Sequence, residues 1–316
     1  DVAINGDRVV AVGDLSAATA ESVVDATGLA VSPGFVNMLS WATESLIVDG
    51  RSQGDLRQGV TLEVFGEGNS LGPMNAAMKE EWLETFVDYV GSEQRAAELL
   101  GGAVEVPWTT LGDYLEFLET KGISTNVASF LGATTTRIHE LGYADRAPNE
   151  EELERMRQLV HTAMREGAMG IGSSLIYAPA FYAKTDELVA ISSVAAEYGG
   201  MYISHMRSEG SQLLEALDEL FTIAREAGIR SEIYHLKASR RGNWHKLDEL
   251  IRRVEQAQKD GLQITADMYT YNASSTGLTG VIPTWVQEGG HDAWMNRMRD
   301  PKARKRLLGD LREQLA

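Results

Sequence analysis

The sequence of 316 residues contains no cysteine. Disulfide bridges and thiolate metal ligands are therefore excluded, although this absence does not by itself fix a cellular compartment. The chain also lacks an initiator methionine and an apolar leader, because it begins at Asp1. We expect the native N-terminus to lie upstream, so the cytoplasm is only the default compartment and export stays open.

Two further shortages limit the partners that the chain can have. Basic residues are outnumbered, with 29 Lys and Arg against 46 Asp and Glu, which gives a net charge of −17. Because a surface of this sign repels phosphate backbones and no basic stripe offsets it, we expect no nucleic-acid partner. No run approaches the ~20 apolar residues of a transmembrane helix, so we expect no membrane partner. The oligomeric state has no signature in the sequence.

Two histidines that each close an apolar run are the most informative feature present. His205 ends the run 200–205, His235 ends the run 229–235, and a helical pattern follows each of them. Successive strands of a β/α repeat would present both imidazoles at the same carboxyl edge of one sheet. That edge is where α/β barrels build their active sites, and paired imidazoles there suit a divalent metal.

The rest of the chain alternates apolar runs with amphipathic helical patterns. This alternation predicts a parallel sheet covered by helices, with helices starting near Glu151 and Thr185 and a charged helix over 301–315. The predicted strands are Leu29–Val36, Val60–Gly66, Asn126–Gly132, Ala168–Ser173, Met201–His205, Arg230–His235 and Leu262–Asp267. The predicted fold class is therefore α/β, a (β/α)8 TIM barrel with about seven of its eight strands in this chain.

Before the barrel, residues 1–30 contain only short apolar pieces separated by turn signals. The pieces are Val2–Ile4, Val9–Val12 and Val23–Val24, with Asn5-Gly6-Asp7 and Gly13-Asp14 between them. Such a fragment is too small to hold a core by itself. We therefore expect residues 1–30 to form part of a small β-domain and residues 31–316 to form the barrel.

Several motifs occur in an order and spacing that are specific when they are taken together. They are Pro33-Gly-Phe, Gly59-Val-Thr, Glu166-Gly-Ala-Met-Gly-Ile-Gly-Ser-Ser, Ser204-His-Met-Arg-Ser-Glu-Gly, His235-Leu-Lys and Ala266-Asp-Met-Tyr-Thr-Tyr-Asn. In these motifs the chain resembles the N-acyl-D-amino-acid deacylases (D-aminoacylases) of the amidohydrolase superfamily. The resemblance implies a metal-dependent barrel of the same type, with a small β-sandwich assembled from both chain ends.

The chemistry that the resemblance implies is the hydrolysis of a linear amide to a carboxylate and an amine. Such a reaction uses a divalent metal to activate water and a carboxylate to move the proton. The resemblance assigns His205 and His235 to one zinc ion, although other divalent metals stay open. It assigns Lys237, Tyr269 and Ser275 to the substrate's carboxylate, and the alternatives are a solvated charge for Lys237 and strand-end packing for the other two.

The chain departs from the superfamily at both remaining metal positions. Where amidohydrolases carry His-x-His, this chain reads Leu39-Ser40-Trp41, so we expect one ion rather than two. Where the deacylases carry a cysteine ligand, Gly68 stands, with Glu67 one place earlier. A carboxylate is a competent zinc ligand, so we expect Glu67 to be the third ligand; a surface turn glutamate is the alternative.

A third departure concerns proton transfer. The aspartate that the resemblance implies lies at the end of the eighth strand, so we expect it beyond Ala316 and predict no catalytic residue within this chain. Asp267 ends the seventh strand and is expected to be structural. Arg207 and Glu209 either orient ligands or form a loop salt bridge.

Three functions stay open at this point. The leading hypothesis is a zinc-dependent hydrolase of carbon–nitrogen bonds other than peptide bonds, acting on an N-acyl amino acid with a free carboxylate. A dipeptidase or another small C–N hydrolase on the same scaffold is the second. A degenerate barrel that binds a ligand or partner without catalysis is the third, because both His-x-His and the cysteine are lost. Neither the exact substrate nor its D or L preference follows from the sequence.

Overall fold

A computed structural model describes residues 1–315, with side chains through residue 312. The chain divides into two compact units, Asp1–Phe35 and the residues from Val36 onward, and each is described by itself. Over the described residues, no helix combines the length and the apolar character that a membrane span requires.

The first unit is a β-hairpin followed by an extended loop. Strands β1 (Val2–Asn5) and β2 (Arg8–Val12) pair antiparallel. Their apolar side chains stay exposed, with Ile4 at 64% and its partner Val9 at 62%. The apolar pair at 23–24 forms no strand. A β-sandwich is not shown by these residues, and the predicted β-domain over 1–30 stays a prediction.

The second unit is built on parallel strands that follow one another in chain order. Its sheets have the orders β3-β4-β5 and β6-β7-β8-β9-β10. The pairing of β4 with β5 and the successive pairings from β6 to β10 are parallel. Strands β5 and β6 flank Phe130, whose backbone N–H donates to the carbonyl of Phe65 (2.9 Å). The strands are β3 (Phe35–Asn37), β4 (Val60–Phe65), β5 (Asn126–Ser129), β6 (Leu131–Gly132), β7 (Gly170–Ser174), β8 (Met201–His205), β9 (Arg230–Ile233) and β10 (Ile264–Ala266).

Each predicted strand corresponds to an observed one when β5 and β6 are counted as a single interrupted strand. The boundaries of the first prediction are wrong: it starts at Leu29, whereas β3 starts at Phe35. Leu29 and Val31 are 74% and 60% exposed, so the apolar run extends beyond the part that pairs. In the described residues β3 and β10 are the outer strands and do not pair with each other. The structure therefore shows an α/β fold, and the closed barrel stays a prediction.

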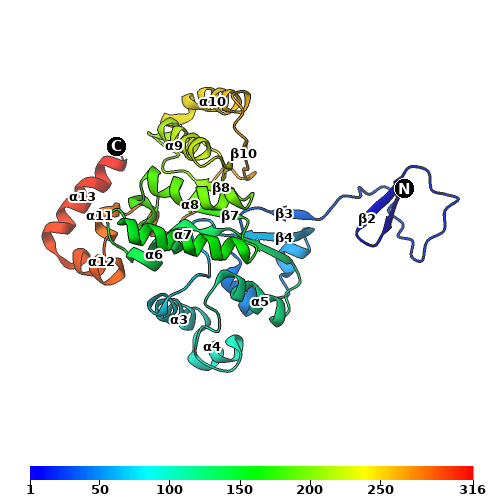
Figure 1. Ribbon diagram of the computed structural model, residues 1–316, viewed down its shortest axis with the longest axis horizontal. Coiled ribbons are helices and arrows are strands. Elements are labelled where there is room, and N and C mark those ends of the chain that lie inside the picture. Colours follow the sequence, from blue (N-terminus) through cyan, green and yellow to red (C-terminus); the bar gives the residue numbers. More distant parts are fainter. Residues whose placement is uncertain (316) are drawn as a thin grey trace. The chain divides into compact units, whose positions relative to one another are not determined.

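Helices cover the strands (Figure 1), and α6 and α8 both pack on β7. The predictions near Glu151, at Thr185 and over 301–315 correspond to α7, α8 and α13, and Asn149 starts α7 with a capping box. The α-helices are α1 (Thr43–Val48), α2 (Gln53–Leu56), α3 (Ala76–Val90), α4 (Glu93–Leu100), α5 (Leu111–Lys121), α6 (Ala133–Leu141), α7 (Glu150–Arg165), α8 (Thr185–Glu197), α9 (Leu213–Glu226), α10 (Leu247–Lys259), α11 (Thr284–Gln287), α12 (Gly290–Arg299) and α13 (Pro301–Leu315).

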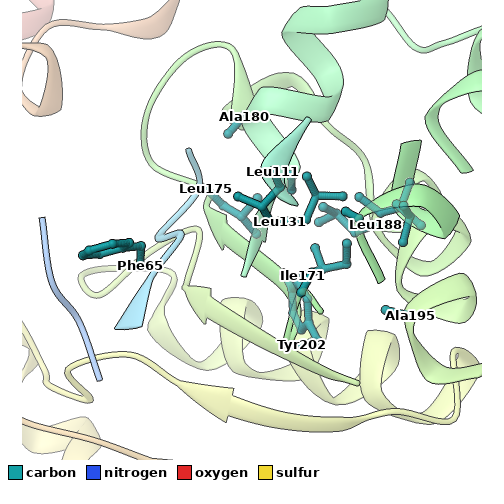
Figure 2. Close-up of a cluster of buried hydrophobic side chains, with 14 of the residues drawn as sticks. Phe65, Leu111, Leu131, Ile171, Leu175, Ala180, Leu188, Ala195 and Tyr202 are labelled. Carbon is teal, nitrogen blue, oxygen red and sulfur yellow. The ribbon is translucent and has the colours of Figure 1, made fainter. Parts of the chain in front are cut away.

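The core lies between the strands and these helices. Figure 2 shows Leu131 and Ile171 from β6 and β7 close to Leu188 of α8, and all three are at most 1% exposed. Burying a side chain of this size stabilises a fold by about 1.5–3 kcal/mol relative to leaving it exposed. A core of this kind holds the strands, and with them the side chains at the strand ends, in fixed positions.

Candidate metal centre

The two predicted histidines meet at the carboxyl ends of neighbouring strands. His205 is the last residue of β8, and His235 follows β9 by two residues. Both are buried, and their ring centroids are 4.4 Å apart with the planes at 85°. His235 Nε2 lies 3.0 Å from His205 Nδ1, so one nitrogen of each ring points at the same place.

The backbone of His235 is held in an uncommon conformation by Asp267. His235 has a φ of +40°, in the left-handed region that residues with a side chain seldom adopt. Its backbone N–H donates to Asp267 Oδ1 (2.5 Å), just after β10. The Asp267 backbone also pairs with this strand end, since Leu236 N–H donates to the Asp267 carbonyl (2.9 Å). Asp267 therefore fixes the direction of the imidazole by holding the backbone of His235.

Glu67 reaches the same place from a turn after β4. The turn needs the glycines on both sides, with φ of +106° at Gly66 and +78° at Gly68. A Cβ on Gly68 would lie 2.7 Å from the Cβ of Ser174, so there is no room for one. The turn buries Glu67 and places its Oε1 2.9 Å from His205 Nδ1 and 3.4 Å from His235 Nε2. Burial raises the pKa of Glu67, but the hydrogen bonds from the two imidazoles outweigh it and the pKa is lowered.

These three atoms have the chemistry and the spacing of a metal-ligand set. Glu67, His205 and His235 are a buried group whose potential ligand atoms all lie within 4.8 Å of one another. The distances of 2.9, 3.0 and 3.4 Å are close to the roughly 3.3 Å that separates ligands in a tetrahedron with zinc bonds of about 2.0 Å. Two imidazole nitrogens and one carboxylate oxygen are donors that zinc accepts, so the residues fit a divalent ion.

A fourth residue, Trp41, contacts the other oxygen of Glu67. Its indole Nε1–H donates to Glu67 Oε2 (3.0 Å). The sequence excludes Trp41 as a metal ligand but gives no sign of this contact. Trp41 and Leu39 both line the cavity beside the three candidate ligands.

Glu209 contacts the imidazoles from the opposite side. Its Oε1 lies 3.0 Å from His235 Nδ1 and accepts a hydrogen bond from Lys237 Nζ (2.5 Å). Burial raises the pKa of Glu209, but the hydrogen bond from His235 and the charges of His205 and Lys237 lower it to about 2. Burial lowers the pKa of His235, but hydrogen bonds to Glu209 and Glu67 raise it to about 9. Two carboxylates therefore stabilise a positive charge on the imidazole of His235.

Arg207 and Glu209, the two candidates for orienting ligands, have different partners. Glu209 contacts His235 directly, whereas Arg207 pairs with Glu219 of α9 (2.8 Å) and donates to the backbone carbonyl of Phe181. Arg207 thus makes the loop salt bridge that was one alternative for it.

Lys237, Tyr269 and Ser275 line one cavity of about 1010 Å³ together with the candidate ligands. The Lys237 ammonium lies on Glu209 and 2.8 Å from His235 Nδ1, with the Tyr269 ring centroid 5.3 Å away. The structure therefore brings the three residues to one cavity, with the ammonium beside the imidazole of His235.

A tyrosine and a threonine from two loops join across the same cavity. The Tyr177 hydroxyl lies 2.6 Å from Thr276 Oγ1, and the Tyr177 ring is 5.7 Å from the ring of His205. Tyr177 lies in the loop that follows β7. Its contact depends on the fold of the loop 271–277, which no local pattern predicts.

Several known proteins are similar to this chain in sequence and in fold. No family model matches the chain. A D-aminoacylase of Alcaligenes xylosoxydans xylosoxydans is 33% identical over 279 residues, which is 88% of this chain and 54% of that protein. A solved D-aminoacylase, described as defining a novel subset of amidohydrolases, has 30% identity and a TM-score of 0.71 over 85% of this chain and 54% of that one.

A second D-aminoacylase structure has 29% identity, the same TM-score of 0.71 and the same coverage of 85% and 54%. Its description names a binuclear metal centre, with activation by one metal and attenuation by a second. The chain thus spans about half the length of the relatives that it matches. In sequence and in fold this chain is similar to that half of a D-aminoacylase, which confirms its resemblance to the N-acyl-D-amino-acid deacylases of the amidohydrolase superfamily.

Proposed function

We propose that the protein is a metal-dependent amidohydrolase that cleaves a linear amide of the N-acyl-D-amino-acid type. The observation that carries the proposal is the convergence of Glu67, His205 and His235 in one cavity. The similarity to D-aminoacylase over most of the chain supports the substrate class.

The proposed ligands of the metal are His205 Nδ1, His235 Nε2 and Glu67 Oε1. A divalent ion held there would supply Lewis acidity and a nucleophile at neutral pH. We propose one ion, because Leu39 and Trp41 cannot replace the His-x-His ligands of a second. Zinc fits the donor set, and other divalent first-row metals fit it as well.

The residues around the ligands have separate proposed roles. Glu209 accepts a hydrogen bond from His235 Nδ1, which leaves the lone pair of Nε2 free for the metal. Lys237, Tyr269 and Ser275 bind the carboxylate of the substrate, and their place along the cavity supports this assignment. Lys237 also neutralises Glu209 next to the imidazoles, so it serves both groups.

The proton-transfer group is proposed to be an aspartate outside residues 1–316. Asp267 is assigned a structural role instead, because its Oδ1 accepts the backbone N–H of His235. We propose that the strand order β3 to β10 belongs to a (β/α)8 barrel and that the hairpin at 1–30 belongs to a small β-sandwich.

The function is tested by hydrolysis assays on the complete, zinc-supplied protein. We expect release of the acyl group from N-acetyl-D-amino acids, and little cleavage of the L-enantiomers or of dipeptides. His205→Ala should abolish activity, whereas His161→Ala should not, because His161 lies in α7 and bonds to Tyr198. Full activity of His205→Ala, or preferential cleavage of dipeptides, would overturn the proposal.

A further inference from the structure

We infer that Trp41 is a positioning residue of the metal centre, which holds Glu67 so that a single carboxylate oxygen faces the two imidazoles. The inference rests on the proposed function, because it takes Glu67, His205 and His235 as the metal ligands. It adds a role for a residue that neither ligates a metal nor carries a charge.

The loop that carries Trp41 is anchored on both sides of the indole. The preceding residue, Ser40, is buried, and its N–H donates to the carbonyl of Val64 in β4 (2.9 Å). Its hydroxyl donates to Glu63 (2.7 Å) and accepts the N–H of Ala42 (3.2 Å). Because Glu63 and Val64 belong to the strand that leads to Glu67, the indole and the carboxylate are fixed to one element.

The two oxygens of Glu67 have different partners. Oε1 faces His205 and His235, whereas Oε2 accepts the indole N–H of Trp41 (3.0 Å). These are the side-chain partners of the carboxylate among the described residues. A hydrogen bond from outside the ligand set fixes the rotation of a ligating carboxylate, and losing such a bond typically costs 10–100-fold in metal affinity or activity.

The same contact bears on the number of ions. A carboxylate that bridges two metal ions through both of its oxygens needs each oxygen to ligate, and here the indole engages one of them. Leu39 lines the same cavity, and its side chain offers no atom that could ligate a metal. Trp41 therefore acts both as an orienting group for the first ion and as an obstacle to a second.

The test compares Trp41→Phe with the parent protein and with Trp285→Phe in the complete chain. Trp41→Phe removes the N–H and keeps an aromatic ring at a side chain that is 59% exposed. Trp285→Phe is a matched control, because its indole also donates to a carboxylate (Asp310, 2.8 Å), but in α11 and among residues that do not line the cavity. The measured quantity is the apparent zinc Kd, by competition with a chromophoric chelator.

We expect the zinc Kd of Trp41→Phe to rise ~10–100-fold, with Trp285→Phe within about twofold of the parent. The increase in Tm on adding zinc, taken relative to each variant's own metal-free Tm, separates weaker binding from a less stable fold. An unchanged zinc Kd and an unchanged zinc-induced Tm increase in Trp41→Phe would overturn this inference alone. A parent protein that binds no zinc would overturn both this inference and the proposed function.

Discussion

Single side chains at this site are each held by at least two partners. His235 is fixed through its main chain by Asp267 and through its ring by Glu209, and Glu67 is shared between the imidazoles and Trp41. Such sharing explains why the carboxylates of the buried Glu67 and the half-buried Glu209 are tolerated. Each acidic oxygen faces a donor, so burial of the charge is compensated.

Residue-level prediction from sequence can name a candidate side chain where a local pattern marks it, and the structure brings the three candidate ligands together. His205 and His235 follow apolar runs, and Glu67 is located by its offset from Gly59-Val-Thr. The Trp41–Glu67 and Glu209–His235 contacts have no such local pattern, because they join residues from separate strand ends. Side-chain directions there are set by the tertiary structure, which no spacing along the chain encodes.

At this scale we predict that Lys237→Met impairs the binding of substrates with a free carboxylate. Losing a charged hydrogen bond of about 1.5–3 kcal/mol corresponds to a roughly 10–150-fold loss in kcat/KM for an N-acetyl-D-amino acid. The corresponding uncharged amide should be affected much less, because it lacks the carboxylate.

The measurement is kcat/KM for both substrates, with zinc content determined alongside. Lys79→Met serves as the control, because Lys79 bonds to Thr109 on the surface of the protein. An equal loss for the acid and the amide would contradict the assignment of Lys237 to the substrate's carboxylate.

At the scale of elements, the turns that follow the strands place the ligands. The strands themselves are predictable, since alternating apolar runs and amphipathic helices mark all of them from β3 to β10. These are seven strands when β5 and β6 are counted as one. The start of the first one is mispredicted because an apolar run continues past the paired part. The geometry of the turn after β4 is predictable only in outline, from the glycines that flank Glu67.

We predict that Gly68→Ala destabilises the protein more than an alanine substitution at another glycine with positive φ, because it disrupts the turn after β4. Gly68 (φ +78°) has Ser174 2.7 Å from the position of a Cβ, whereas Gly101 (φ +101°), after α4, has nothing within 4 Å. Gly101→Ala should cost only the backbone term of about 1–2 kcal/mol in the free energy of unfolding.

Gly68→Ala should cost more than that and should also weaken zinc binding, because the turn that presents Glu67 must move. Urea unfolding of the metal-free proteins and zinc titration measure the two effects. Equal costs for the two glycines, with zinc affinity unchanged, would show that the turn can accept a side chain.

At the scale of the whole molecule, the site joins parts of the chain that are far apart in sequence. Glu67 is 138 residues from His205 and 168 from His235, and each lies at the end of a different strand. An ion bound by all three would link β4, β8 and β9. Because it would bind the folded chain and not the unfolded one, it would also stabilise the fold by mass action.

The chain spans about half of the D-aminoacylases that it matches, and its strand order runs from β3 to β10 without closing in the described residues. The sequence predicts the individual strands of this series, since each strand is marked locally. Closure of the sheet into a barrel has no local signal in the sequence, because it depends on a pairing between elements at opposite ends of the series.

The most direct test of the central claim is the metal content of the purified complete protein, measured by elemental analysis. The comparison is with a His205→Ala/His235→Ala variant and with His161→Ala as the control. We expect about one divalent ion per chain in the parent and in His161→Ala, and none in the double variant. A parent protein that stays metal-free after zinc is supplied, or a double variant that retains its ion, would contradict it.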